Sequence, residues 1–421
     1  MDMHHFAYQD GQLLADGVSL EEIARQVGTP TYVYSQATLT CHFQAFSQAF
    51  ASLDTLICFA VKSNTNRAVM GLFASLGGGA DIVSGGELYR AMKAGVEPGR
   101  IVYSGVGKSE AEMEAALKAG ILMFNLESVQ ELAVLDQVAA RLGVKAPVSL
   151  RVNPDVDAQT HPKITTGLAK NKFGLDVELA REQYWIMARL KHLEVKGISC
   201  HIGSQLTDVR PFADALERLA ELIGALRGEG LELQVLDLGG GLGITYNDEE
   251  PPNPAQYAAA LRETVGRLGL KLVLEPGRVL VGNAGLLLSR VLYTKQTPAK
   301  CFIVVDAAMN DLIRPSFYDS FHDIWPVRQK QGGETVIADV VGPICETGDF
   351  LARERALPTF ERGELMAVMS AGAYGFAMSS NYNSRPRAAE VLVHGERLAV
   401  VRQRESYEDL CRGESLPDWM K

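Results

Sequence analysis

An alternation of apolar, β-favouring runs with helical patterns begins near residue 55 and continues to about residue 275. The strand-like runs fall at 55–61, 80–84, 101–104, 121–125, 147–152, 195–201, 233–238 and 271–275. Strands that alternate with helices are parallel, because each helix carries the chain back to the same end of the sheet. Eight such units over about 220 residues predict an α/β fold with a closed (β/α)8 TIM barrel better than an open doubly wound sheet. The first run is not followed by G-x-G-x-x-G, which argues against a dinucleotide-binding fold.

Local signals mark where several of the helices begin and end. Ser109 with Glu112, and Ser128 with Glu131, have the spacing of a capping box at a helix start. Glycines stand where helices should end, at positions 77, 95, 120 and 143. These signals support helices in the gaps between the strand-like runs.

The rhythm changes after about residue 285. Helical patterns vanish, and runs with a period of two appear at 286–294, 301–306, 335–341, 364–370 and 389–402, with turns at Gly332-Gly333 and Gly395. Residues 1–30 have the pattern of two short strands and a helix. We therefore expect an N-terminal segment (1–30) that packs with the β domain, a (β/α)8 barrel (31–285) and an all-β C-terminal domain (286–421).

The composition argues against several classes of protein. The formal net charge is −10 and no block of Lys or Arg stands out, so nucleic acid is not an expected partner. The six cysteines lie far apart without a CxxC pair, so neither a structural zinc nor a dense disulfide framework is indicated. No apolar run approaches the ~18 residues of a membrane span, and residues 1–8 do not have the pattern of a signal peptide. We expect no metal, no membrane and a cytoplasmic location.

Polar side chains collect at the ends of the predicted strands. They are Lys62 after the first strand, Asp81 in the second, Arg151 in the fifth, His201 in the sixth and Glu275 in the eighth. Active sites of (β/α)8 barrels lie at the carboxyl ends of the strands, so we expect these groups to meet. An amine at such a position can form a Schiff base with a carbonyl compound. The alternative for Lys62 is a lysine that caps a strand and points into solvent, as most lysines do.

Glycine-rich turns follow the seventh and eighth strands, at Gly239–Gly241 and Glu275–Arg278. The loops after these strands usually form the phosphate site of such barrels, and glycines let backbone N–H groups close around an anion. A lysine, an anion site and a carboxylate together suit pyridoxal 5′-phosphate, because its aldehyde condenses with Lys62 and Glu275 keeps its ring nitrogen protonated. A class-I aldolase barrel shares the Schiff-base lysine but has no need of the carboxylate.

Ten short motifs occur in order over nearly the whole length. They are FAVKSN (59–64), ADIVSGGEL (80–88), RVNP (151–154), THPKITTGLAKNKFG (160–174), HIGSQ (201–205), LGGGLG (238–243), EPGR (275–278), NDLIRPSFY (310–318), CETGD (345–349) and GAYG (372–375). Together they resemble the fold type III pyridoxal-phosphate-dependent decarboxylases, and most closely those that act on diaminopimelate. The resemblance implies an alanine racemase-like fold, in which the TIM barrel is followed by an all-β domain.

The resemblance also implies which residues hold the cofactor. Lys62 would hold it as a Schiff base, His201 would stack on the ring face and Glu275 would pair with the ring nitrogen. Asp81 and Arg151 would support Lys62. The phosphate would be bound by Ser204, Gly240, Gly241, Gly277, Arg278 and Tyr374.

Diaminopimelate carries both a carboxylate and an ammonium at its distal end, so its site needs cations and an anion together. By the resemblance, Arg278, Arg314 and Tyr318 would bind the carboxylate, since guanidinium groups bind carboxylates in bidentate fashion. Tyr374 would also contact the substrate, and Glu346 fits the ammonium. The alternative for Arg314 is a surface salt bridge.

The resemblance further implies a homodimer with a shared active site. Cys345 and Glu346 would reach the site of the partner subunit, and either Cys345 or Lys62 would return a proton after CO2 leaves. The alternative for a lone cysteine is a small buried hydrophobe.

A long irregular stretch, residues 153–174, separates the fifth strand from its helix and contains Pro154, His161 and Pro162. Loops of that length are uncommon unless they are functional. We therefore expect this loop to take part in the site, and a disordered flap is the alternative.

The activity implied by the resemblance is decarboxylation of meso-2,6-diaminopimelate to L-lysine and CO2, the last step of lysine biosynthesis. Close alternatives are decarboxylases of arginine, ornithine or carboxynorspermidine, although the ornithine and arginine relatives lack the CETGD and NDLIRP pairing. A non-catalytic, cofactor-binding regulator and an amino-acid racemase share the fold. Lys62, Cys345 and Glu346 argue against the regulator, and the chain length and CETGD argue against the racemase.

Overall fold

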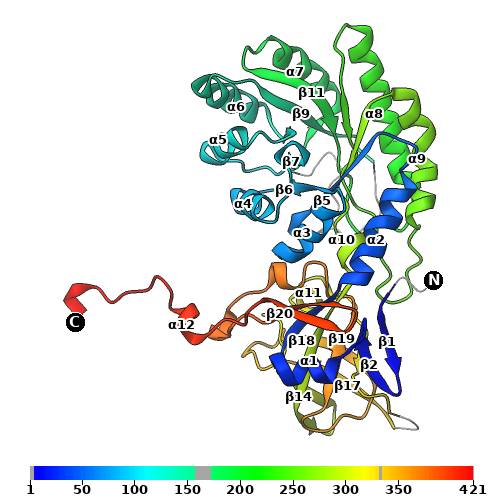
Figure 1. Cartoon of the computed structure of the whole chain (residues 1–421), viewed down its shortest axis with the longest axis vertical. Helices are drawn as coiled ribbons and strands as arrows, with labels where there is room; N and C mark the ends of the chain where they lie inside the picture. The colour runs from blue at the N-terminus through cyan, green and yellow to red at the C-terminus, as the bar shows by residue number, and fades with distance from the viewer. Residues whose placement is uncertain (1–3, 157–171, 331–333, 421) are drawn as a thin grey trace. The chain divides into compact units, whose positions relative to one another are not determined.

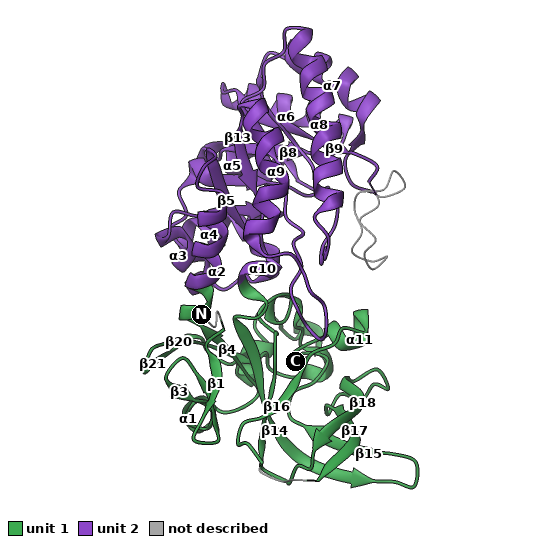
Figure 2. Ribbon diagram, turned by 90° about the vertical axis from the view of Figure 1, so that its right-hand side faces the viewer, with its two compact units in different colours: residues 1–39, 281–421 green, residues 40–280 purple. Residues whose placement is uncertain are grey.

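A computed structural model describes residues 4–156, 172–330 and 334–420 of the chain (Figure 1). The chain forms two compact units, each described here by itself (Figure 2). Unit 1 consists of Met1–Leu39 and Val281–Lys421, and unit 2 consists of Thr40–Leu280. Both ends of the sequence therefore belong to unit 1, and unit 2 is a single continuous stretch.

Unit 2 contains a closed barrel of parallel strands. The order is β9-β11-β12-β13-β5-β6-β7-β8, and β8 pairs with β9 to close the sheet. The strands are β5 (Thr55–Ala60), β6 (Gly79–Ile82), β7 (Ile101–Tyr103), β8 (Met123–Leu126), β9 (Ala146–Asn153), β11 (Leu193–Ser199), β12 (Val235–Asp237) and β13 (Lys271–Leu274). The prediction of a (β/α)8 barrel is confirmed.

Helices lie around the outside of this barrel (Figure 1). They are α3 (Arg67–Ser75), α4 (Gly85–Lys93), α5 (Glu110–Ala119), α6 (Val129–Leu142), α7 (Val177–Arg189), α8 (Arg210–Gly228) and α9 (Pro254–Leu268). The predicted capping signals are confirmed, since the Ser109 and Glu112 side chains cap α5 reciprocally and Ser128 accepts a hydrogen bond from the Glu131 N–H. Gly120 ends α5 with a φ of 75°, a left-handed conformation that glycine adopts without steric cost.

Unit 1 is built around a mixed sheet of nine strands. Its main path runs β18-β17-β15-β14-β4-β20-β21, with β19 and β16 attached to β14 and β19. The strands are β4 (Thr31–Ser35), β14 (Gly285–Gln296), β15 (Cys301–Val305), β16 (Ile324–Pro326), β17 (Thr335–Val341), β18 (Phe350–Pro358), β19 (Leu365–Val368), β20 (Ala389–His394) and β21 (Arg397–Arg402). Gly395 lies in the turn between β20 and β21 as predicted, whereas Gly332 and Gly333 lie outside the described residues.

The N-terminal residues add a small sheet and a helix to unit 1. The elements are β1 (Phe6–Gln9), β2 (Gln12–Ala15), β3 (Val18–Ser19) and α1 (Leu20–Val27). Leu13 and Ile23 share a hydrophobic core with Leu286 and Val391 of the large sheet. Burial of this shared apolar surface attaches the N-terminal segment to the sheet.

Three features of unit 1 differ from the sequence prediction. Strand β4 was missed, although it lies between β14 and β20, antiparallel to the first and parallel to the second. Strands β16 and β18 were also missed, because β16 is only three residues long and β18 carries consecutive charged residues at its centre. The prediction that helical structure vanishes after residue 285 is wrong, since α11 (Arg314–Tyr318) and α12 (Tyr407–Leu410) are short helices there.

Two helices span the boundary between the units, α2 (Gln36–Ala49) and α10 (Arg278–Val281). Within the described ranges, the helices are too short or too polar to cross a lipid bilayer.

Candidate active site

The carboxyl ends of the barrel strands bring together the lysine and the acid on which the sequence prediction rests. Lys62 lies in the single turn η1 (Val61–Ser63) that follows β5, and its Nζ donates a hydrogen bond to Asp81 Oδ2 at 2.7 Å. Asp81 comes from the neighbouring strand β6 and is fully buried. Strand β5 pairs with β13, and the Ala60 N–H donates to the Pro276 carbonyl oxygen at 3.1 Å, so Lys62 and Glu275 follow neighbouring strands at the same end of the barrel. Lys62 pairs with a buried carboxylate and does not simply point into solvent.

Glu275 belongs to a group of buried acids. Burial raises the pKa of Glu275 well above its ordinary value, and the carboxylates of Asp237 and Asp81 raise it further. Burial also raises the pKa of Asp237, at the end of β12, to about 6. Because Glu275 and Asp237 are hydrogen-bonded to each other, the pair retains a proton at a pH where isolated carboxylates have lost theirs.

Asn125 at β8 connects these acids, and the sequence prediction missed it. Its Nδ2 donates to Asp237 Oδ2 at 2.9 Å and lies 3.4 Å from Glu275 Oε1. Its Oδ1 accepts a 2.5 Å hydrogen bond from Ser149 Oγ of β9. A polar layer therefore crosses the inside of the barrel. The available signal was a single polar residue within the apolar run Met123–Leu126.

His201 follows β11 and is held in its neutral form. Its Nδ1 accepts a hydrogen bond from the Gly240 N–H at 3.2 Å, which requires Nδ1 to be unprotonated. Burial, and then the positive charges of Arg151 and Lys62, lower the pKa of His201 well below its usual value. A neutral imidazole presents an uncharged flat face.

A buried ion pair between Arg151 and Glu127 lies next to the backbone of His201. Arg151 donates to Glu127 Oε1 at 2.8 Å and to the His201 carbonyl oxygen at 3.3 Å. Glu127 also accepts the Gly174 N–H at 3.0 Å, at the end of the predicted functional loop. Arg151 therefore contacts His201 and Glu127. Glu127 is a further residue that the sequence prediction missed. The loop residues 157–171, with His161 and Pro162, lie outside the described residues.

The glycine-rich turn packs tightly against its neighbours. A Cβ atom on Gly240 would lie 2.2 Å from the Glu275 carbonyl oxygen, and one on Gly241 would lie 2.5 Å from the Gly203 carbonyl oxygen. Glycine is therefore required at both positions by the close approach of three loops. Gly277 is also crowded, since its Cβ would lie 3.0 Å from the Cβ of Ala60.

A serine and an arginine lie beside this turn. Arg278 is buried, and its guanidinium donates to Ser204 Oγ at 3.2 Å and to Tyr246 Oη at 2.6 Å. Ser204 follows Gly203, which approaches the glycine turn. A cation, a hydroxyl group and the backbone N–H groups of a glycine turn are the donors that a phosphate group requires. Tyr246 was not predicted.

The remaining predicted residues belong to unit 1. Cys345 and Glu346 are exposed in the loop after β17. The Cys345 N–H donates to Asn383 Oδ1 at 2.7 Å, and Tyr382 Oη lies 3.4 Å from Glu346 Oε2. Because Cys345 is exposed, the alternative of a small buried hydrophobe does not hold in this chain.

Arg314 and Tyr318 lie on α11, and Arg314 is only 4% exposed, so it is not part of a surface salt bridge. The Arg314 guanidinium donates to His322 Nε2 and to Ser320 Oγ, both at 3.2 Å. Tyr374 is half-buried in unit 1 and has a left-handed φ of 57°. For a bulky residue this conformation costs energy and often marks a functional position.

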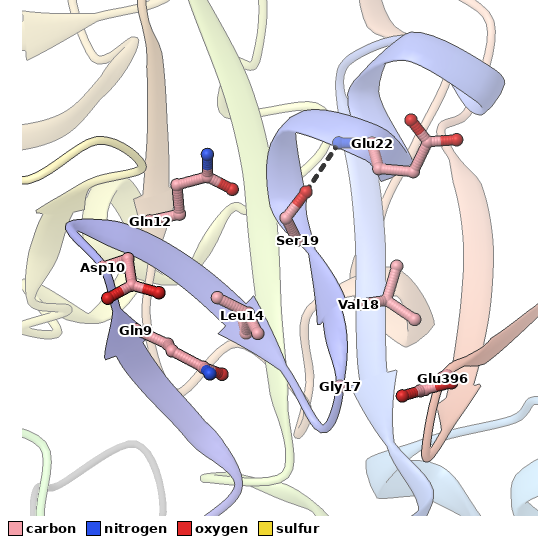
Figure 3. A pocket seen from close by; sticks show the side chains of 9 residues that line it. All are labelled: Gln9, Asp10, Gln12, Leu14, Gly17, Val18, Ser19, Glu22 and Glu396. Atoms are coloured by element: carbon pink, nitrogen blue, oxygen red, sulfur yellow. Dashed lines mark hydrogen bonds between the residues drawn. The ribbon is translucent and has the colours of Figure 1, made fainter.

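A hollow lined mainly by N-terminal residues of unit 1 has the wrong chemistry for this site (Figure 3). It has a volume of about 450 Å³, and its charged lining residues are Asp10, Glu22 and Glu396. Without a basic side chain in its lining, it does not fit a phosphate or a dicarboxylic amino acid.

Comparisons with known proteins agree with this arrangement. The model of the pyridoxal binding domain of pyridoxal-dependent decarboxylases matches residues 36–282. A diaminopimelate decarboxylase from Pseudomonas aeruginosa is 55% identical over 414 residues, which cover 98% of this chain and 99% of that protein.

Solved structures give the same result. The diaminopimelate decarboxylase from Helicobacter pylori, complexed with L-lysine, has a TM-score of 0.90 and 42% identity, covering 93% of this chain and 98% of that chain. The diaminopimelate decarboxylase from M. jannaschii, also in complex with L-lysine, has a TM-score of 0.94 and 37% identity, covering 99% of both chains.

Proposed function

The chain belongs to the diaminopimelate decarboxylase family of pyridoxal-dependent decarboxylases, and from this we propose that it converts meso-2,6-diaminopimelate to L-lysine and CO2. The observation that carries the proposal is that Lys62, Asp81 and Glu275 lie on or directly after neighbouring strands at one end of the barrel, with Lys62 hydrogen-bonded to Asp81. The L-lysine bound by two solved relatives is the product of this reaction.

The residues at the barrel end fit pyridoxal 5′-phosphate. Asp81 Oδ1 is buried without a hydrogen-bond partner in the described part of the chain, and Glu275 lies among other carboxylates, so the site favours an additional positive group. A protonated pyridine nitrogen is such a group. When bound, the cofactor supplies an electron sink for the electron pair that remains when CO2 leaves.

We assign the cofactor-holding roles as follows. Lys62 would hold the cofactor through its amine, Glu275 would keep a proton at the ring nitrogen, and the neutral imidazole of His201 would contact the ring. Asp81 orients Lys62, and Arg151 orients His201. The phosphate group is held by Ser204, Gly240, Gly241, Gly277 and Arg278, with Tyr374 as a further donor.

The substrate has charges at its distal end that the remaining residues can satisfy. We assign Arg278, Arg314, Tyr318 and Tyr374 to the distal carboxylate, because guanidinium and hydroxyl groups are hydrogen-bond donors. Glu346 is assigned to the distal ammonium. A pocket that pairs both charges rejects ornithine and arginine, which would leave buried cations without a partner.

The active unit that we propose is a homodimer in the cytoplasm. Cys345 and Glu346 are exposed on their own chain, as residues that complete a partner's site must be. Cys345 or Lys62 returns the proton to the carbon from which CO2 has left. The dimer, the location and the choice of proton donor stay predictions.

The test is a set of four reactions. Each contains the protein, pyridoxal 5′-phosphate and one candidate substrate: diaminopimelate, arginine, ornithine or carboxynorspermidine. We expect CO2 and L-lysine from diaminopimelate alone, measured by CO2 release and mass spectrometry. Comparable kcat/KM for another of these compounds would assign a different substrate. A bound-cofactor absorbance band without CO2 from any compound would favour the non-catalytic regulator.

A further inference from the structure

Residues 403–420 form an arm that extends away from the rest of unit 1 (Figure 1), and several of its large apolar side chains are exposed. The exposed fractions are 76% for Tyr407, 64% for Leu416, 86% for Trp419 and 64% for Met420. Single exposed apolar residues are normal, but an exposed Trp-Met pair near the end of an arm with two further exposed apolar residues is not. A Trp side chain is also among the residues that contribute most to protein interfaces.

The arm has local structure of its own. In α12, Ser406 and Asp409 form a reciprocal capping box, and the turn η5 (Asp418–Met420) carries Trp419. Preformed turns reduce the entropy that is lost when a segment docks. The arm is therefore a segment with defined turns whose apolar side chains lack cover from the described residues of its own chain.

The base of the arm is fixed next to the Cys345 loop. Glu405 Oε2 accepts hydrogen bonds from Asn381 Nδ2 at 2.7 Å and from the Arg387 N–H at 2.8 Å. The segment that starts at Asn381 continues through Tyr382 to Asn383, which binds the Cys345 N–H. The arm follows β21 and is thus tied, through Glu405, to the segment that contacts Cys345 and Glu346.

Two further aromatic residues of unit 1 are exposed near the Cys345 loop. Tyr382 is 44% exposed, and Phe317 on α11 is 46% exposed. Ser316 of α11 donates to the Gly348 carbonyl oxygen at 2.6 Å, which joins this helix to the Cys345 loop. Exposed aromatic side chains therefore lie both on the arm and beside the Cys345 loop.

We infer that the arm docks on a second copy of this chain and helps to hold the two copies together. The inference rests on the proposed function, in which the Cys345 loop meets a partner subunit. Because the base of the arm is bound next to the Cys345 loop, the arm would lie close to the same partner subunit. In a twofold dimer each copy contributes one arm and receives one, so every apolar contact occurs twice.

The first experiment uses the fluorescence of Trp419 to report whether the arm is docked. The chain has three tryptophans, so the full-length W185F/W325F variant retains only Trp419. We expect Trp419 emission to be blue-shifted and protected from acrylamide where sedimentation velocity shows dimer, and to become solvent-exposed on dilution to monomer. Solvent-exposed emission while the dimer persists would overturn the inference. Protected emission in the monomer would overturn it too, because the arm would then fold back on its own chain.

The second experiment measures the strength of the dimer. We expect removal of residues 411–421, or the W419S/M420S variant, to raise the dimer dissociation constant about tenfold or more. Tyr293→Ser, which alters a 59%-exposed aromatic residue on β14, is the matched control and should leave the constant unchanged. An unchanged constant for the arm variants, with diaminopimelate turnover intact, would refute the arm and leave the proposed function standing. Full turnover by a monomer would refute the shared site as well.

Discussion

The barrel end and the Cys345 loop hold their chemical groups in different ways. At the barrel end, Lys62, Asp81 and Glu275 come from different strands and are fixed by contacts between side chains. In the loop, Cys345 and Glu346 are exposed, and the contact that fixes Cys345 is made by its backbone N–H. The comparison indicates that the groups of the barrel end are fixed within one chain, whereas those of the loop are exposed on it, as the proposed shared site requires.

Lys62→Ala tests the barrel end most severely. We expect the absorbance band of the covalently bound cofactor to disappear and kcat to fall by about 10⁴-fold or more, since the covalent link is lost. Absorbance spectra and steady-state kinetics measure both effects. Lys118→Ala, which removes an exposed ion pair with Glu114, is the control and should change neither. A normal band in Lys62→Ala would remove Lys62 from the site.

Glu275→Gln tests the acid at the same end. Gln keeps the size of the side chain but cannot hold the ring nitrogen protonated, so we expect kcat to fall about 10²–10³-fold. Asp237→Asn should have a smaller effect, because Asp237 acts through Glu275. The kcat values and the pH dependence of the cofactor band measure the difference. Equal losses in the two variants would mean that the acids act as one unit.

Cys345→Ala tests the exposed loop and should have a smaller effect than the barrel variants. We expect kcat to fall about 10–100-fold with little change in KM, as for loss of a proton donor. Cys41→Ala, which alters a half-buried cysteine of α2, is the control.

The proposed dimer can be tested more sharply by mixing two variants. Mixing Lys62→Ala and Cys345→Ala proteins should restore about a quarter of the wild-type activity, because half of the dimers are mixed and each mixed dimer has one intact shared site. No recovery after verified subunit exchange would place both residues in the same chain's site.

The sequence was informative where chemistry coincides with strand ends. Lys62, Asp81, His201 and Glu275 could be predicted because a barrel directs the ends of its strands to one place. Asn125 and Glu127 lie in and just after β8, but a single amide and a single glutamate gave no specific chemical signal. Their roles become visible only from their contacts with Asp237 and Arg151.

The β-rich unit was harder to predict than the barrel. Strand β4 is a five-residue run between Pro30 and a helix, and nothing local indicates that it pairs with β14 and β20, more than 240 residues later. In β18, charged residues at positions 353–355 hide the alternation of a strand, and Glu354 has a left-handed φ of 47°. The barrel repeats one local unit, whereas this sheet depends on pairings between distant segments.

The smallest expected effect is on the pH dependence of thermal stability in the cofactor-free protein, through the buried acid Asp237 at the barrel end. Burial raises the pKa of Asp237 to about 6, so folding favours its protonated form. Its contribution to stability is present below the unfolded pKa near 4 and is lost as the pH rises through about 6. Asp237→Asn keeps a neutral side chain at every pH. Relative to the wild type, its melting temperature should therefore rise by about 2–4 °C between pH 4 and pH 7, measured by calorimetry.

A matched variant separates this effect from the general response to pH. Asp54→Asn removes an exposed carboxylate that pairs with Lys271, and its difference from the wild type should stay nearly constant over the same range. A constant difference for Asp237→Asn as well would mean that Asp237 is ionised throughout, and that the proton of the pair resides on Glu275. Asp237 and Glu275 would still form a buried acid pair at the barrel end, unlike the exposed groups of the Cys345 loop, but Glu275 and not Asp237 would carry the shared proton.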